Sequence, residues 1–135
     1  MAVARDAEGR PTSVTLAPGK SITYAYNPRG LVASVTDWTG GGATYGYDDA
    51  GRMVSITRSN GVTTRYRHDT DDRLVGIDED AAARLSSIVL ARNARGDITA
   101  SSRTGLLDPA PAIQSVVAAY DAAHQRQGWC KVFCV

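Results

Sequence analysis

The chain has 135 residues, of which 15 are basic and 14 acidic, so its formal net charge is +1 at pH 7. This balance argues against a nucleic-acid-binding face, and the 43% share of hydrophobic residues is typical of a folded globular protein. The long apolar stretches contain charges, which excludes a membrane-spanning helix, and residues 1–6 lack the apolar run of a signal peptide.

The first predicted elements belong to a phrase that returns every 21 residues and therefore decides the architecture. An incomplete copy at Asp6–Arg10 is followed by three copies in strict register and then by two less regular ones. The repeat positions are Tyr24, Tyr26, Asn27 and Gly30; Tyr45, Tyr47, Asp48, Gly51 and Arg52; Tyr66, Asp69 and Asp72; Asn93 and Gly96; and Tyr120 and Asp121.

Residues 21–26 alternate apolar and polar side chains, which is the period of a strand. The next four residues, Asn27–Gly30, have Asn first, Pro second and Gly fourth, as a type I turn prefers. A second strand follows at 31–36, and three glycines at 40–42 let the chain reverse. Two strands and two reversals per unit predict a run of β-hairpins.

The unit that begins at Asp48 repeats this order of strands and turns. Its second reversal contains Asn60–Gly61, the strongest short hairpin signal, because both residues accept positive φ. Each Asp or Asn at the first turn position is interpreted as structural, since its side-chain oxygen can accept backbone N–H groups and a catalytic acid would not tolerate Asn as a substitute. The tyrosines Tyr24, Tyr45 and Tyr66 share one strand phase and are predicted to stack across neighbouring strands.

The period is disturbed after Ile77, because Gly96 lies 24 residues beyond Asp72 instead of 21. The extra residues are placed at Asp78–Ala83, where either one helical turn or a longer polar hairpin loop fits. Strand character then resumes at 84–92.

The last copy of the phrase is Tyr120–Asp121, seven residues later than the period requires, with the insertion placed around 106–111. Residues 113–120 fit either a strand or a short helix near the C-terminus, and we favour the strand because Val116, Val117 and Tyr120 are β-compatible. We predict a repeat region at 1–126 and a non-repeat tail at 127–135. The tail holds Cys130 and Cys134, interpreted as unpaired thiols in a loose segment.

These phrases resemble the YD repeat of bacterial Rhs proteins, of insecticidal toxin-complex shells and of animal teneurins. The match rests on Tyr-x-Tyr-Asp-x-x-Gly-Arg-Met at Tyr45–Met53, in register with its neighbours over about 5–126. The resemblance implies an all-β fold, a curled antiparallel sheet of β-hairpin repeats that forms a fragment of a hollow shell. In the bacterial proteins the shell encloses a toxic C-terminal domain, and the family is secreted or displayed at the cell surface.

The resemblance therefore implies a structural, non-enzymatic role without cofactor or metal, with the rest of the shell and its toxin cargo as partners. Two departures stand out. About six units are too few to close a shell, and Asp108–Pro109–Ala110–Pro111 lacks the Gly of the family's self-cleaving phrase, so autoproteolysis is not assigned. No toxin domain is expected within 127–135.

The alternative function is a carbohydrate-binding or adhesion module. Trp38, beside the triple glycine, is the candidate ligand contact, although Ala17 and Ser59 at the equivalent positions give it no repeated counterparts. His68 and His124 are interpreted as substituted repeat positions, and the Arg95–Gly96–Asp97 tripeptide as a by-product of the repeat turn. Because a strip of hairpins has two unpaired edges, self-association through those edges is also predicted.

Overall fold

The computed structural model describes residues 1–105 with their side chains, and the backbone of 113–120 and 126–134. The chain divides into two compact units, Met1–Thr63 and Thr64–Val135. Every described element is a β-strand, and each printed pairing between strands is antiparallel. The predicted all-β hairpin class is confirmed. The predicted curl depends on how the two units are placed and stays a prediction.

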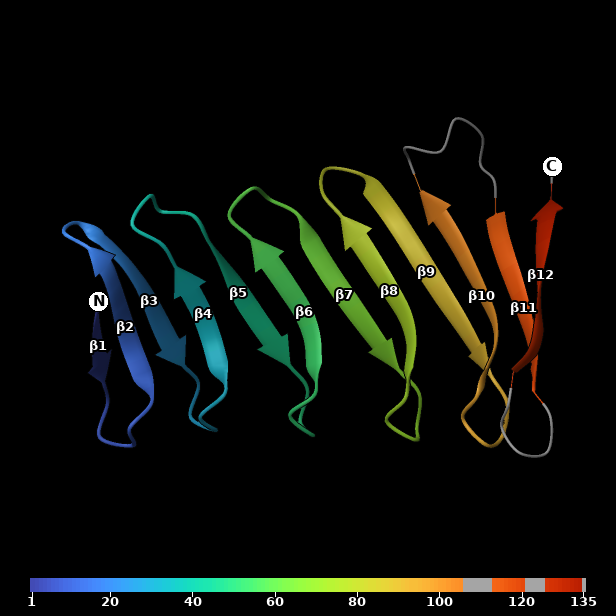
Figure 1. Ribbon diagram of the computed structural model, residues 1–135, viewed down its shortest axis with the longest axis horizontal. Coiled ribbons are helices and arrows are strands. Elements are labelled where there is room, and N and C mark those ends of the chain that lie inside the picture. The colour runs from blue at the N-terminus through green and yellow to red at the C-terminus, as the bar shows by residue number, and fades with distance from the viewer. Residues whose placement is uncertain (106–112, 121–125, 135) are drawn as a thin grey trace. The chain divides into compact units, whose positions relative to one another are not determined.

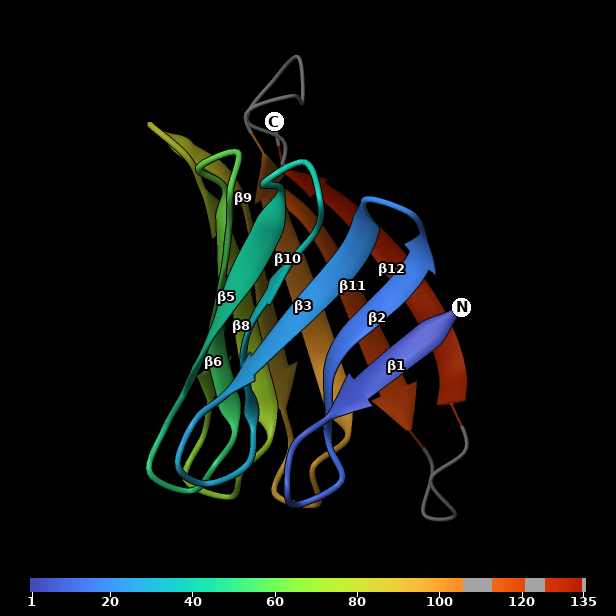
Figure 2. The ribbon, with the colours of Figure 1, turned by 90° about the vertical axis from the view of Figure 1, so that its left-hand side faces the viewer.

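The first unit is a sheet whose strands are neighbours in the order of the sequence (Figures 1 and 2). Its strands are β1 (Ala2–Arg5), β2 (Pro11–Ala17), β3 (Lys20–Tyr26), β4 (Val32–Thr36), β5 (Gly42–Tyr47) and β6 (Met53–Arg58). The turns after β1, β3 and β5 lie at one end of the strands, and the reversals after β2 and β4 lie at the other (Figure 1). This is an up-and-down arrangement in which every connection is a short hairpin.

The two faces of the first unit differ in chemistry because side chains alternate along each strand. One face carries cross-strand pairs of large residues, such as Val14 opposite Ile22 and Tyr24 opposite Val35. The other face carries hydroxyl side chains, including Thr44, which lies opposite both Ser34 and Thr57. Among the described residues no large side chain is fully buried.

The second unit continues with β7 (Thr63–His68), whose first residue closes the first unit, and then β8 (Leu74–Asp80), β9 (Arg84–Arg92), β10 (Ile98–Gly105), β11 (Ile113–Tyr120) and β12 (Arg126–Cys134). Within this unit the strands again follow sequence order, with β9 between β8 and β10. Strands β8 and β9 are longer than their counterparts β4 and β5 in the first unit.

The extra residues after Ile77 lengthen a hairpin, so the alternative of a helical turn at Asp78–Ala83 is wrong. Asp78 lies opposite Ser87, and Asp80 lies opposite Arg84, which extends the β8–β9 ladder to the loop. The loop itself closes with a hydrogen bond from the Ala81 N–H to the Ala83 carbonyl of 2.8 Å. The ladder gives Asp78, Glu79 and Asp80 partners on β9, which a single helical turn would not do.

The two C-terminal expectations have different outcomes. Residues 113–120 form strand β11, with Ser101 of β10 opposite Val116, so the helix alternative is wrong and the favoured strand is confirmed. Tertiary pairing and β-branched residues outweigh the helical spacing there. The predicted loose tail falls largely within strand β12, which ends at Cys134 and pairs along β11. The loose-segment interpretation is therefore wrong. The boundary between the repeat region and the non-repeat tail at residue 126 stays a prediction.

Candidate functional site

The five described copies of the repeat turn share one backbone geometry. They are Asp6–Arg10, Asn27–Leu31, Asp48–Arg52, Asp69–Arg73 and Asn93–Asp97. In each copy the N–H of the fourth residue donates to the carbonyl of the first, and the N–H of the first donates to the carbonyl of the fifth. In the copy at Asp48 both hydrogen bonds are 3.0 Å long. This is a type I turn followed by a left-handed residue, which joins two strands with the correct twist.

The side chain of the first residue in each turn forms hydrogen bonds within that turn. Oδ1 of Asp69 accepts the N–H groups of Asp71 and Arg73, both at 2.9 Å, and Oδ1 of Asn27 accepts two N–H groups at 3.0 Å in the same way. The amide oxygen of Asn and the carboxylate oxygen of Asp perform the same task, so either residue closes the turn.

The residue type at the fifth position of the turn depends on whether the first residue is Asp or Asn. Where the first residue is Asp, the fifth is Arg, and its Nε donates to the other carboxylate oxygen, at 2.6 Å between Arg52 and Asp48. Where the first is Asn, the fifth is Leu31 or Asp97, and Nδ2 of Asn93 donates to that Asp carboxylate at 2.9 Å. The sequence phrase Asp-x-x-Gly-Arg therefore describes one closed hydrogen-bonded unit.

Hydrogen bonding favours the ionised form of these carboxylates. The backbone N–H of Arg73 is the main cause that lowers the pKa of Asp69 below its ordinary value of 3.8, with burial opposing it and the Arg73 guanidinium assisting. The Thr39 hydroxyl lowers the pKa of Asp37 in a turn of the same kind between β4 and β5. A group that stays ionised well below neutral pH is poorly suited to general acid–base catalysis.

The fourth turn position has positive φ in every copy, for example 83° at Gly51 and 63° at Asp72. Asp72 is the one non-glycine residue with positive φ among the described residues. In the reversal at the other end of the strands, Gly61 has a φ of 82°, whereas the φ of Asn60 is not positive. The turn predicted at Asn60–Gly61 is present, but the reason given for it is wrong, because only the glycine takes the left-handed conformation.

The repeat tyrosines do not form the predicted ladder. Tyr24 lies opposite Val35, and Tyr45 lies opposite Ile56, because residues 21 apart are separated by an intervening strand. Two strand spacings amount to about 9.6 Å, beyond a direct cross-strand pair. Tyr66 holds the same phase in β7, and Tyr120 lies in β11.

The second tyrosine of the phrase connects one hairpin to the previous one. The hydroxyl of Tyr26 donates to the carbonyl of Pro11 at 2.7 Å, and that of Tyr47 donates to the carbonyl of Val32 at 2.9 Å. Both bonds are partly buried and span 15 residues. They bind the strand that enters each turn to the residue that begins the strand before it.

We expect Tyr47→Phe to lower the free energy of unfolding by about 1 kcal/mol, because a partly buried carbonyl loses its donor. Tyr45→Phe is the matched control, since among the described residues the Tyr45 hydroxyl has no hydrogen-bond partner. Urea unfolding followed by circular dichroism compares the two variants. Equal losses of stability in the two variants would show that the hydrogen bond from the Tyr47 hydroxyl does not stabilise the fold.

Charged side chains gather on one part of the second unit, which the sequence reasoning missed. This Asp78 cluster consists of Arg65, Arg67, Asp78, Asp80, Arg84 and Ser87, from strands β7, β8 and β9. Asp78 is only 6% exposed. Its carboxylate accepts the Ser87 hydroxyl at 2.5 Å and Nε of Arg67 at 2.9 Å.

The rest of the Asp78 cluster forms a second layer of ion pairs. Nε of Arg84 lies 3.3 Å from Asp80, which also binds the guanidinium of Arg65. Gly76 allows this packing, because a Cβ there would lie 2.4 Å from Nη2 of Arg67. The signal that could have revealed the cluster is the alternation of Arg at 65 and 67 with Asp at 78 and 80 in adjacent strands.

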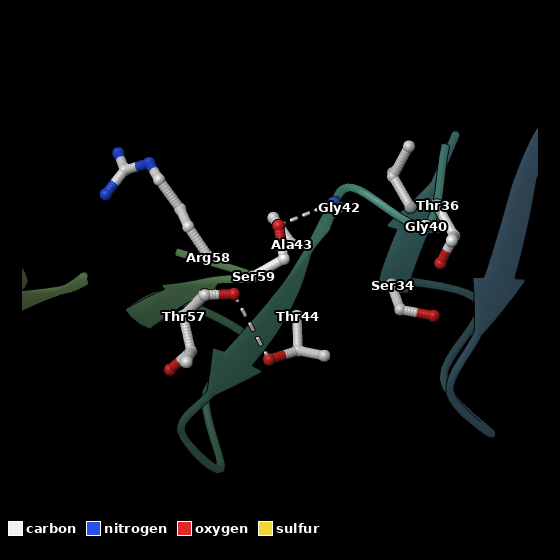
Figure 3. Close-up of a pocket in the computed structure, with 10 residues that line it drawn as sticks. Ser34, Thr36, Gly40, Gly42, Ala43, Thr44, Thr57, Arg58 and Ser59 are labelled. Carbon is white, nitrogen blue, oxygen red and sulfur yellow. Dashed lines mark hydrogen bonds between the residues drawn. The ribbon is translucent and has the colours of Figure 1, made fainter. Parts of the chain in front are cut away.

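A hollow of about 260 Å³ lies among β4, β5 and β6 on the first unit (Figure 3). Hydroxyl groups of Ser34, Thr44 and Thr57 line it, and the Thr44 hydroxyl is directed toward the Thr57 carbonyl. Trp38 occupies the second position of the turn after β4 and is 46% exposed. It does not line the hollow, although Gly40 of the same turn does.

The remaining candidate residues are not brought together. His68 lies in β7, whereas Asp121 and His124 fall outside the described residues, as does Asp108–Pro109–Ala110–Pro111. The Arg95–Gly96–Asp97 tripeptide forms the end of a repeat turn, with Asp97 bound to Asn93. Within residues 1–105 no three His, Cys, Asp or Glu side chains are grouped so that they could hold a metal ion. The described part of the chain also lacks a helix with the length and apolar character that a bilayer crossing requires.

Comparison with known proteins identifies the repeat and the fold. The profile of the RHS repeat matches residues 5–44 and 47–84. No curated protein sequence matches the chain. The crystal structure of TcdB2-TccC3-TEV is similar, with a TM-score of 0.78 and 19% identity over 92% of this chain. A Photorhabdus luminescens Tc holotoxin pore gives 0.80 and 19% over the same share. The chain covers 6% of each of those two chains, and identities this low show the fold alone.

Proposed function

Because the chain belongs to the RHS repeat family, we propose that it is a structural, non-catalytic segment of an RHS repeat shell that encloses a toxic C-terminal domain. Its partners in this role are the neighbouring repeats of the shell and the enclosed toxin. The chain spans only about 6% of the similar solved chains, which fits one stretch of a wall.

The observation that carries the proposal is the repeat turn. The recurring polar residues are the ones a catalytic site would need, and in each copy they are bound to their own turn. Asp48, Asp69 and Asn93 all accept N–H groups of the same turn, and both Asp residues also bind Arg. A sequence that repeats only its turn and strand positions preserves an architecture, which is the property of repeat proteins.

The order of the strands also supports a wall. In each unit the hairpins add one after another to the same sheet, so every strand has its sequence neighbours beside it. No large side chain among the described residues is fully buried, and an apolar face of this kind is stabilised when adjoining parts of a larger assembly cover it.

Cryo-electron microscopy of the natural polypeptide that contains this sequence tests the proposal. The expected result is a hollow particle in which residues 1–105 form part of the wall and density for a second segment lies inside. The proposal is overturned if these residues form a separate body outside any shell, or if the particle encloses nothing.

A carbohydrate-binding or adhesion module is the second candidate, favoured by Trp38. An aromatic ring that is 46% exposed in a turn could stack on a sugar, and the hydroxyl-lined hollow begins at Gly40 of the same turn.

For this second candidate we expect binding of the purified chain to a glycan array, with Trp38→Ala losing at least tenfold in affinity. Leu16→Ala is the control, since Leu16 is another exposed large residue, at 48%, in strand β2. Calorimetric titration with the best glycan measures the difference. An array without signal, or equal affinities of the two variants, would remove this candidate.

A further inference from the structure

The reversal that follows β6 contains the one Asn–Gly step of the sequence, at Asn60–Gly61. Both residues are exposed, and a Cβ built on Gly61 would meet no heavy atom within 4 Å. Two backbone hydrogen bonds of 2.9 Å close the turn. The Arg58 N–H donates to the Val62 carbonyl, and the Gly61 N–H donates to the Arg58 carbonyl. The side chain of Asn60 is therefore open to water and lies next to a residue without a side chain.

The Asn60 side chain replaces an acceptor that this turn lacks. The preceding reversal begins with Asp37, whose Oδ1 accepts the N–H of Gly41 at 3.0 Å. The reversal after β6 begins with Arg58, whose side chain has no acceptor atom. Here Oδ1 of Asn60 accepts the Val62 N–H at 3.1 Å. Among the residues that the structure describes, Nδ2 of Asn60 has no hydrogen-bond partner. The amide carbonyl is thus held by a donor, and the amine is free.

We propose that Asn60 is a site of spontaneous deamidation, which converts it to aspartate or isoaspartate. Hydroxide removes the amide proton of Gly61, and the nitrogen attacks Cγ of Asn60 to form a succinimide ring. The Cγ–Nδ2 bond breaks, and this nitrogen takes a proton from water and leaves as ammonia, which restores the hydroxide. Water then opens the ring, so the net reaction consumes one water, releases one ammonia and changes no oxidation state. Opening at Cγ gives aspartate, and opening at the main-chain carbonyl gives isoaspartate.

The geometry of the turn assists this attack. Gly61 has no Cβ to obstruct the ring, and the Val62 N–H stabilises the negative charge that develops on Oδ1 during the attack. The bond from the Gly61 N–H to the Arg58 carbonyl must open first. Exposed ends of hairpins are among the segments of a protein that open at the lowest free-energy cost. The rate of this local opening therefore limits the reaction.

The other two asparagines of the sequence lack these features and serve as internal controls. Asn27 precedes Pro28, whose ring nitrogen has no proton to lose. Asn93 precedes Ala94, whose Cβ obstructs the ring, and its side chain is partly buried. The Nδ2 group of Asn93 donates to Asp97 at 2.9 Å, so the amine that would leave is bound. The structure therefore selects Asn60 among the three.

The two products should affect the turn differently. Aspartate keeps an oxygen that accepts the Val62 N–H, and it adds one negative charge. Isoaspartate adds a methylene group to the main chain between residues 60 and 61. The two hydrogen bonds that close the turn join Arg58 to Gly61 and Val62, so the longer main chain cannot keep both. Deamidation thus opens this reversal only through isoaspartate. The proposal goes beyond the shell role, which does not require a chemical change at this position.

The test incubates the purified chain in alkaline buffer made with heavy-oxygen water and maps its peptides by mass spectrometry. Electron-transfer fragmentation distinguishes aspartate from isoaspartate. We expect one heavy oxygen at position 60, introduced at least about tenfold faster than at Asn93, where the bonds of the side chain must break first. An unchanged Asn60, or equal rates at Asn60 and Asn93, would overturn the proposal.

Two variants complete the test. Asn60→Thr introduces the residue that Thr39 supplies at the equivalent position of the preceding reversal, and it should give no product. Freshly prepared Asn60→Asp should unfold at the same urea concentration as the unchanged chain. The isolated isoaspartate form should have a ratio of folded to unfolded chains at least about tenfold lower, because two hydrogen bonds are disturbed. An isoaspartate form as stable as the unchanged chain would contradict the assigned effect on the turn. Heavy oxygen in the Asn60→Thr chain would place the reaction elsewhere.

Discussion

Gly51→Val is expected to lower the free energy of unfolding by about 2 kcal/mol. Gly51 has a φ of 83°, a region that L-residues enter at a cost of about 1–2 kcal/mol and that β-branched residues tolerate least. The space around the residue is adequate, since a Cβ would meet Leu31 at 3.8 Å. The loss is therefore one of backbone conformation.

Gly51→Asn is the matched control, because Asn adopts the left-handed conformation more readily and the equivalent position already holds Asp72. We expect a clearly smaller loss for Asn than for Val. Asp69→Asn should also cost less than Gly51→Val, since the Asn oxygen still accepts the N–H groups of the turn and only the ion pair with Arg73 is lost. Thermal and urea unfolding of the three variants decide the order. Equal losses for Val and Asn would show that φ does not limit this position.

Asp78→Ala should lower the free energy of unfolding by about 1–3 kcal/mol. The carboxylate is buried, and its removal leaves the Ser87 hydroxyl and the Arg67 guanidinium without their acceptor. Asp71→Ala is the control, because Asp71 makes an exposed ion pair with Arg73, and such pairs contribute about 0–1 kcal/mol. Similar losses for the two variants would show that the Asp78 cluster behaves as an ordinary solvated ion pair.

Asp78 also gives the unfolding free energy a dependence on pH. The Ser87 hydroxyl, followed by Arg67 and Arg84, lowers the pKa of Asp78 below its ordinary value of 3.8, although burial opposes them. A lowered pKa means that folding favours the carboxylate, so this contribution is complete above about pH 4 and is lost as the pH falls through the folded value. Unfolding measured between pH 2 and 6 should show a shallower acid limb for Asp78→Asn than for the unchanged chain. Identical slopes would contradict this assignment.

The sequence by itself determined the repeat turns. A turn such as Asp48–Arg52 is held by hydrogen bonds between residues at most four apart, so its residue types, their order and their 21-residue spacing contain the information that forms it. The strand phase is equally local, because alternation along one strand decides which residues share a face. Hairpin repeats and the all-β class follow from those two patterns.

Only the tertiary structure decided which side chains meet. Tyr24 lies opposite Val35 and not opposite another tyrosine. Cross-strand neighbours depend on the register between strands and not on the repeat period. In the Asp78 cluster, Arg65 and Arg67 of β7 bind carboxylates 11–15 residues further along the chain, and Ser87 of β9 binds Asp78 from the other side. The same pairing made β11 and β12 strands where the local signals were ambiguous, since an extended segment gains backbone hydrogen bonds only when a neighbouring strand is present to supply them.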